Sequence, residues 1–158
     1  MKINKSAEQA VYVLTMLALQ QGHTPVKSQV LSDIMGVSDS SLKKVLAKLS
    51  AAGLVSGSAS KTGGYILRRP IADITLFDVF QALGVHDNAI ELSGLEQRIY
   101  PNAQHTRESA QKVRATLERA LTAFDEQLKT LSLGDLVIDQ AHQGGAVDWA
   151  ARLVDVQE

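Results

Sequence analysis

The sequence contains no cysteine in its 158 residues and few aromatic side chains, which make up 4% of the chain. The missing thiols exclude disulfides, thiolate metal sites, cysteine-held iron–sulfur clusters and thiol nucleophiles. No apolar run reaches the roughly 18 residues that a membrane-spanning helix needs. Residues 1–5 lead into an amphipathic segment rather than a signal peptide. We therefore expect a folded cytoplasmic protein without a membrane partner.

Charges of both signs are present but unevenly distributed. The formal net charge is −1, and 45% of the residues are apolar, which is enough for a core. Residues 1–70 carry nine Lys or Arg against three acidic residues, whereas residues 71–158 carry seven against fourteen. A basic first half fits a module that faces polyanionic DNA. A chance distribution, or attraction between the two halves, would give the same asymmetry.

Three helices are predicted in the first 53 residues. Apolar residues recur at helical spacing over 6–21, and a short second helix ends at Gly36, which can take the positive φ of a tight turn. Ser38 is the expected N-cap of the third helix. The buried stripe of that helix is predicted to be Leu42, Val45, Leu46 and Leu49. Its opposite face carries Ser40, Lys43, Lys44, Ala47 and Lys48.

Two short strands, 54–58 and 65–68, are expected to form a hairpin around a polar tip at 59–64. A capping-box pattern at Thr75 then opens a further helix. A helix-turn-helix followed by such a hairpin predicts a winged helix-turn-helix domain over residues 1–84. The overall fold class is therefore mainly α with a small β-hairpin wing.

The order of these elements makes DNA the expected partner of the third helix and the wing. Serines at the start of the helix can reach phosphates or base edges, lysines supply charge, and tip glycines allow close backbone approach. A lysine face exposed only to solvent is the alternative. The candidate DNA-binding residues are Lys27, Ser28, Ser38, Ser40, Ser41, Lys43, Lys44, Lys48, Lys61, Thr62, Gly63 and Gly64.

The second half is predicted to hold a loop region at 85–105, a long helix and a short following helix within 106–143, and a tail at 144–158. Ser132 begins a second capping-box pattern, so we expect a helix from there to about residues 140–142. The long helix has an apolar stripe at nearly heptad spacing, which requires a partner surface. The members of this stripe that we assign to dimerisation are Val113, Leu117, Ala120, Phe124 and Leu128.

Four strings resemble the Rrf2 family of bacterial transcription regulators: 46–55, 63–68, 74–78 and 131–137. The resemblance covers about residues 1–142. It implies a homodimer, joined through the long C-terminal dimerisation helix, that binds a roughly palindromic operator in double-stranded DNA and controls transcription, most simply as a repressor.

The sequence also departs from the family. Members that hold an iron–sulfur cluster carry three cysteines in the segment corresponding to residues 85–105, and this chain has none, so it resembles a cluster-free branch and we predict no cofactor. His86 and His105 alone lack the further ligands of a metal site. The order Ser41-Leu42-Lys43-Lys44 also differs from the usual pattern, so the operator sequence cannot be carried over.

An enzyme is not expected, because nothing has the spacing of a P-loop, a zincin helix or a nucleophile elbow. Two other functions stay open: a dimeric scaffold that binds a protein partner through its acidic half, and a sensor of an unknown small-molecule effector. A pocket for such an effector would be lined by Leu92, Leu95, Ile99 and Tyr100. The operator, the regulated genes, the direction of control and the role of the tail are not determined by the sequence.

Overall fold

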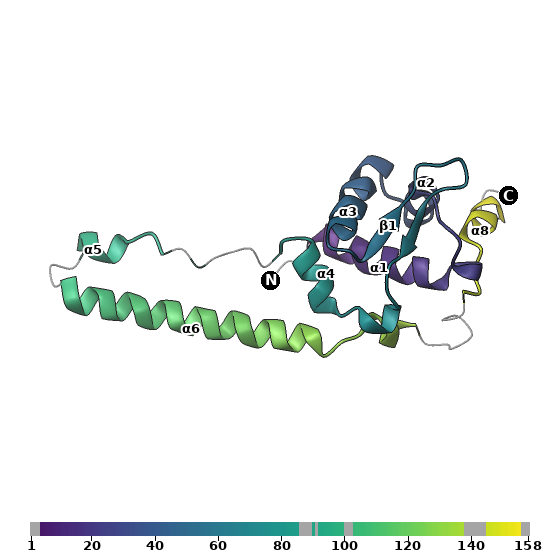
Figure 1. The fold of residues 1–158 in the computed structure, drawn as a ribbon. Helices are drawn as coiled ribbons and strands as arrows, with labels where there is room; N and C mark the ends of the chain where they lie inside the picture. Colours follow the sequence, from purple (N-terminus) through teal and green to yellow (C-terminus); the bar gives the residue numbers. More distant parts are fainter. Residues whose placement is uncertain (1–3, 86–89, 91, 100–102, 138–144, 156–158) are drawn as a thin grey trace.

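The computed structural model describes residues 4–85, 90, 92–99, 103–137 and 145–155. Helices dominate, with one two-stranded antiparallel sheet, so the predicted fold class is confirmed (Figure 1). The α-helices are α1 (Lys5–Leu19), α2 (Ser28–Met35), α3 (Asp39–Ala51), α4 (Leu76–Ala82), α5 (Leu95–Ile99), α6 (Ala103–Lys129) and α8 (Trp149–Asp155). The strands are β1 (Val55–Gly57) and β2 (Tyr65–Leu67), and short 3-10 helices are η1 (Gln21–His23), η2 (Ile71–Asp73) and η3 (Leu133–Leu136).

The helix ends predicted from the sequence, at Gly36 and Ser38, are found in the structure. Gly36 has φ 63° and ends α2 in the left-handed region, where a Cβ is unfavourable. The Ser38 hydroxyl accepts a hydrogen bond from the Ser41 amide at 3.3 Å and so caps α3. Both turns orient α3 so that its apolar stripe faces α1. All four predicted stripe residues, Leu42, Val45, Leu46 and Leu49, are buried.

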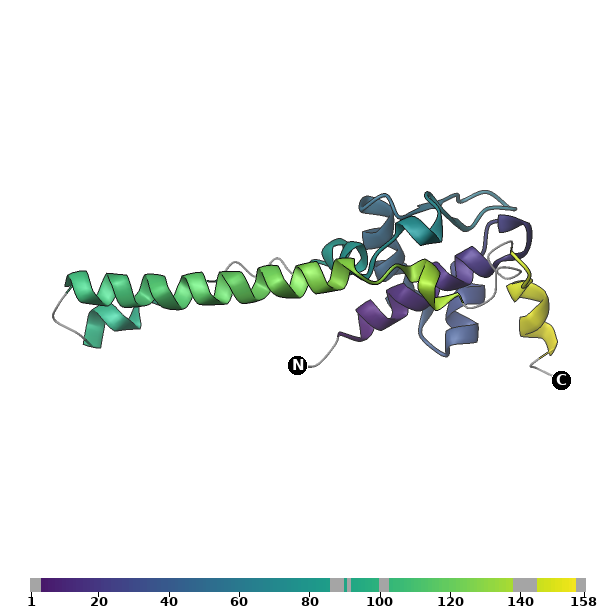
Figure 2. The same cartoon turned by 90° about the horizontal axis from the view of Figure 1, so that it is seen from below.

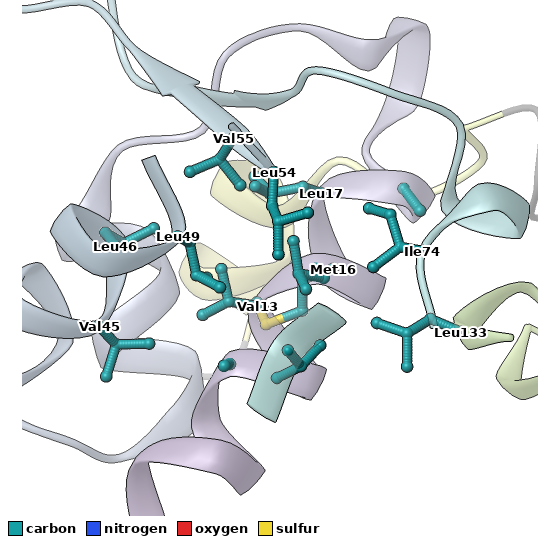
Figure 3. Close-up of a cluster of buried hydrophobic side chains, with 14 of the residues drawn as sticks. Val13, Met16, Leu17, Val45, Leu46, Leu49, Leu54, Val55, Ile74 and Leu133 are labelled. Atoms are coloured by element: carbon teal, nitrogen blue, oxygen red, sulfur yellow. The ribbon is translucent and has the colours of Figure 1, made fainter. Parts of the chain in front are cut away.

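The core lies between α1, α3, the wing and α4. Side chains from α1 such as Val13 and Leu17 meet the α3 stripe on one side and Ile74 and Leu133 on the other (Figure 3). Burial of such side chains contributes roughly 1.5–3 kcal/mol each to folding. The core therefore holds α3 with its polar face outward.

The wing is attached to the helices through Val26. Strands β1 and β2 pair antiparallel, with Val55 opposite Leu67. Val26 adds a further pair of backbone hydrogen bonds, because its amide donates to the Tyr65 carbonyl at 3.0 Å and its carbonyl accepts from the Tyr65 amide at 2.8 Å. The segment just before α2 is thus joined directly to the base of the wing.

Helix α6 leaves the N-terminal domain as an arm, and α5 packs beside its far end (Figures 1 and 2). Its 27 residues span about 40 Å at 1.5 Å per residue. Only the C-terminal end of α6 meets α4, where the Phe80 and Phe124 rings lie 6.3 Å apart between centroids and Leu128 is buried. The centre of the arm therefore lies outside the core.

The helix expected from Ser132 is tested only as far as Val137. The capping box at Ser132 is present, but it opens only the 3-10 turn η3, which ends at Val137. Backbone and side-chain hydrogen bonds hold this turn against η2, including one that Ser132 Oγ donates to the Ala72 carbonyl at 2.8 Å. Val137, with φ −98° and ψ 92°, is outside the helical conformation. The predicted stretch beyond Val137 up to residue 143 lies outside the described residues. Within the predicted tail, the 145–155 segment docks on the helices, because Trp149 is buried against α1.

The Thr75–Asp78 capping box gives a stability prediction. Burial raises the pKa of Asp78, but hydrogen bonds from Thr75 and from Arg69 outweigh it and hold the pKa below its ordinary value of 3.8. Asp78→Ala is expected to lower the free energy of unfolding by about 1–2 kcal/mol near neutral pH. Because the folded pKa is lowered, this difference should be fully present above pH 4 or so and shrink as the pH falls further.

Urea unfolding of the wild type and Asp78→Ala at several pH values measures this effect. Asp33→Ala is the matched control, because Asp33 is an exposed carboxylate on α2 whose side chain, among the described residues, accepts a hydrogen bond from Gln29 one turn away. A difference between wild type and Asp78→Ala that stays constant down to about pH 3 would contradict the assigned role of Asp78.

Candidate nucleic-acid interface

Helix α3 and the wing tip project from the same side of the N-terminal domain, and α6 runs away from them (Figure 1). Ser40, Ser41, Lys43, Lys44 and Ala47 are all exposed on the outer face of α3. The helix begins at this face, so its first amide groups add a partial positive charge there. The predicted α3 residues thus form one surface, apart from Lys48.

Lys43 is held by a neighbouring carboxylate. Its Nζ lies 2.6 Å from Asp39 Oδ2, one helical turn away. The hydrogen bond from Lys43 lowers the pKa of Asp39, and the bond to Asp39 raises the pKa of Lys43. Both groups stay charged at neutral pH, so Asp39 offsets part of the positive charge that Lys43 adds to the surface. Sequence reasoning missed this role of Asp39, although its spacing from Lys43 was a signal for it.

Lys44 is exposed at the centre of the outer face and has no ion-pair or hydrogen-bond partner among the residues that the structure describes. An unpaired ammonium on the outer face of α3 can approach a phosphate without first breaking an internal contact. Lys44 is therefore the cation on α3 best placed for an external anion.

Lys48 was expected to belong to this surface, but its ammonium group is directed at α4. Its Nζ donates a hydrogen bond to the Leu83 carbonyl at 2.9 Å, beyond the last residue of α4. A cation near the C-terminal end of a helix is favourable because it satisfies a carbonyl that has no partner within the helix. The physical reason for the correction is that Lys48 lies on the side of α3 that faces α4.

The start of α2 and the wing tip flank α3. Lys27 is the N-cap residue of α2 and is exposed, and Ser28 is half-buried and helps to lower the pKa of Asp39. Lys61 and Thr62 are exposed at the wing tip. The outer face of α3 is therefore flanked by two further groups of polar side chains, one at the start of α2 and one at the wing tip.

The two tip glycines have a different role from the predicted one. Gly63 and Gly64 are both buried. A Cβ on Gly63 would lie 2.2 Å from the Ser58 carbonyl oxygen, and one on Gly64 would lie 2.6 Å from the backbone of Val26. Glycine is needed here so that the hairpin can close and dock on the segment before α2. The close approach is to the protein's own backbone, so we leave both residues out of the proposed DNA contacts.

The candidate dimerisation stripe on α6 divides into two parts. Phe124 packs beside Phe80, and Leu128 is buried in the core. Val113 and Leu117 are 51% and 43% exposed, and Ala120 is also exposed. Leu121, 40% exposed, borders the same stripe. The centre of α6 thus presents a row of apolar side chains that the described residues of the same chain do not cover.

Of the residues proposed to line an effector pocket, Leu92 is half-buried. Leu95 and Ile99 are 56% and 66% exposed on α5, and Tyr100 lies outside the described residues. No group of three or more His, Asp or Glu side chains within the described part of the chain could hold a metal ion. None of its helices is long and apolar enough to cross a membrane.

The different roles of Lys44 and Lys48 can be tested by the stability of their alanine variants. Lys48→Ala removes the hydrogen bond to Leu83 and is expected to lower the free energy of unfolding by about 1 kcal/mol. Lys44→Ala removes an exposed side chain and should leave stability within about 0.5 kcal/mol of the wild type. Chemical denaturation of both variants measures this, and equal stabilities would refute the assigned role of Lys48.

Comparison with known proteins supplies the family. A family model described as "Rrf2: Iron-dependent Transcriptional regulator" matches residues 3–139. YffB of Lactococcus lactis, an HTH-type transcriptional regulator by name, is 32% identical over 133 residues, which are 84% of this chain and 82% of YffB. YwgB of Bacillus subtilis, named in the same way, is 36% identical over 105 residues, 66% of this chain and 67% of YwgB.

Solved structures agree on the fold. IscR from T. potens aligns with a TM-score of 0.61 at 23% identity, covering 87% of this chain and 86% of that protein. The name of the family model mentions iron, whereas this chain contains no cysteine, the residue whose thiolate holds iron–sulfur clusters. The family and the two named relatives are regulators of transcription and not enzymes, as the sequence indicates. The chain belongs to the Rrf2 family of DNA-binding transcriptional regulators.

Proposed function

We propose that this regulator is a homodimeric repressor that reads a roughly palindromic operator with α3 and needs no iron–sulfur cluster. The observation that supports the proposal most is the exposed and unpaired Lys44 among Ser40, Ser41 and Ala47 on the outer face of α3. These side chains match major-groove chemistry, since lysine binds phosphate or guanine, serine is a short donor and the alanine methyl fits a thymine methyl. A dimer that occupies an operator represses transcription by excluding other proteins from that DNA. The proposed place of action is the cytoplasm of a bacterium.

The flanking elements fit phosphate contacts on either side of the groove. The exposed residues that flank α3 are Lys27 at the start of α2 and Lys61 with Thr62 at the wing tip. We assign them contacts with phosphates rather than with base edges, and such contacts fix the register of α3 on the duplex. Lys43 joins them if Asp39 gives up part of its contact. In a symmetric dimer the two copies of α3 would lie about one turn of B-DNA apart, roughly 34–36 Å.

Operator binding should depend on Lys44 and on salt. Lys43→Ala with Lys44→Ala is expected to weaken binding strongly, by roughly a hundredfold at moderate salt, without unfolding the protein, because both side chains lie off the buried stripe. The slope of log K against log salt should become shallower by about one for each phosphate that the variant no longer neutralises.

The operator must first be found by selecting bound fragments from a pool of genomic DNA. Titrations at several salt concentrations then compare the wild type, the double variant and Lys112→Ala, a control that removes an exposed lysine from α6. Undiminished affinity of the double variant would rule out α3 as the reading element. A wild type with little salt dependence would favour the protein-binding scaffold over the operator-binding regulator.

The dimer is proposed to form through the exposed centre of α6. Leu117→Glu is expected to weaken dimerisation by roughly thirtyfold or more, since a charge in an apolar interface is left without a partner. Its protomer should stay folded because Leu117 lies outside the core. Phe124→Glu, in contrast, should destabilise the protomer itself, since Phe124 packs on Phe80.

Sedimentation and circular dichroism on the same samples separate these effects. Gln111→Glu is the matched control, because it adds the same charge to the opposite face of α6. A mass for Leu117→Glu equal to that of the wild type at low micromolar concentration would exclude this interface.

A further inference from the structure

The 145–155 segment lies beyond the part of the chain that the family model matches, yet it is bound tightly to the end of α1. The Val147 amide donates to the Leu19 carbonyl at 2.9 Å, and the Val147 carbonyl accepts from the Gln21 amide at 2.7 Å. The indole Nε1 of Trp149 donates to the Met16 carbonyl at 2.7 Å. Met16 and Leu19 belong to the last turn of α1, so the segment closes over the C-terminal end of that helix.

The docking site is closely fitted. Trp149 is 7% exposed, and the guanidinium of Arg152 lies 5.5 Å from its ring centre. Gly145 has φ 79°, and a Cβ there would lie 2.3 Å from the Gln20 carbonyl oxygen. A side chain at position 145 is therefore opposed by both the backbone conformation and the contact. The segment can occupy this place only with glycine at its start.

Hydrogen bonds lead from Trp149 to Thr24, close to the residue that pairs with the base of the wing. The Trp149 amide donates to Gln20 Oε1 at 3.3 Å, and Gln20 Nε2 donates to Thr24 Oγ1 at 3.1 Å. Gln20 is 6% exposed, so its amide group depends on these partners. Two residues beyond Thr24, Val26 pairs with Tyr65 at the base of the wing. The turn between Gln20 and Thr24 contains Gly22 and His23, which both have positive φ.

The segment also reaches the surface next to two of the proposed phosphate contacts. Asp148 and Ala150 line a groove of 360 Å³ together with Lys27 and Thr62. Helix α8 packs along α2, the helix whose N-cap is Lys27 (Figure 1). The segment therefore supports the turn before α2, contacts α2 and borders the wing tip, which are the elements that carry the proposed phosphate contacts beside α3.

We propose that the 145–155 segment, anchored by Trp149, positions Lys27 and the wing tip for contact with DNA phosphates and so sets the affinity for the operator. This inference rests on the proposed function of α3 and the wing. Trp149 is a positioning residue, because its ring is buried against α1 and does not itself reach the DNA surface. A purely structural segment would stabilise the fold without changing how many phosphates the folded protein contacts.

Trp149 is the sole tryptophan of the chain, so its fluorescence reports docking directly. Gly145→Ala should undock the segment and keep the reporter, with red-shifted emission and stronger acrylamide quenching than in the wild type. Trp149→Ala is the second variant and removes the anchor itself. Val154→Ala is the matched control, since Val154 is 63% exposed on the same helix.

Each variant is measured as the full chain for folding, dimer mass and operator binding across a range of salt. For Gly145→Ala and Trp149→Ala we expect folded dimers that bind about tenfold more weakly at moderate salt, with a slope against log salt that is shallower by about one to two. Val154→Ala should match the wild type in all readouts.

The outcomes separate the two proposals. A wild type that shows no lysine-dependent binding to DNA contradicts the proposed function, whatever the segment does. Normal wild-type binding together with an undocked Gly145→Ala of equal affinity and salt slope overturns the positioning role alone. Unchanged fluorescence of Gly145→Ala would also overturn it, because the segment would then not be held by the contact at Gln20. Loss of affinity at an unchanged slope would reduce the segment to a stabilising element.

Discussion

The structure depends above all on the burial of α1. This helix contacts α3, α4, β2 and η3, and residues such as Ala10, Val13 and Leu14 are completely enclosed. Because the apolar stripe of α3 packs on α1, the polar face of α3 is left outward. The same helix holds Trp149 through the Met16 carbonyl at its other end. One buried helix therefore determines the direction of the proposed reading surface and anchors the segment that flanks it.

The apolar stripe of α6 extends from the core to a part of the helix that lies outside it. Near its C-terminal end the stripe packs on α4 through Phe124 and Leu128, and near its N-terminal end α5 lies beside it. Between them, Val113 and Leu117 lie on the same face but have no cover within the described part of the chain. A continuous stripe that is covered at both ends and exposed in the middle is what a second copy of the helix would complete.

Features with a local signal could be predicted from the sequence, and features with distant partners could not. The caps at Ser38 and Thr75 and the turn at Gly36 depend on residues three or four positions away, and all three are found as expected. Lys48 was misplaced because its partner carbonyl is 35 residues along the chain. The docking of Trp149 was missed because Met16 is 133 residues away. Gly64 was recognised as a turn residue, but no local pattern shows that the backbone of Val26 would approach it.

The lysines of α3 show why charge counting alone is a weak guide to a nucleic-acid interface. Three lysines stand on what the helical period marks as one face, yet each has a different environment. Lys48 satisfies a helix end, Lys43 is offset by Asp39, and Lys44 has its charge available. Of the three, Lys44 alone presents a charge that is neither paired with a carboxylate nor directed at another helix in the described part of the chain. High affinity must then draw on Lys27 and the wing tip, which makes whatever holds those two elements in place part of the DNA-binding machinery.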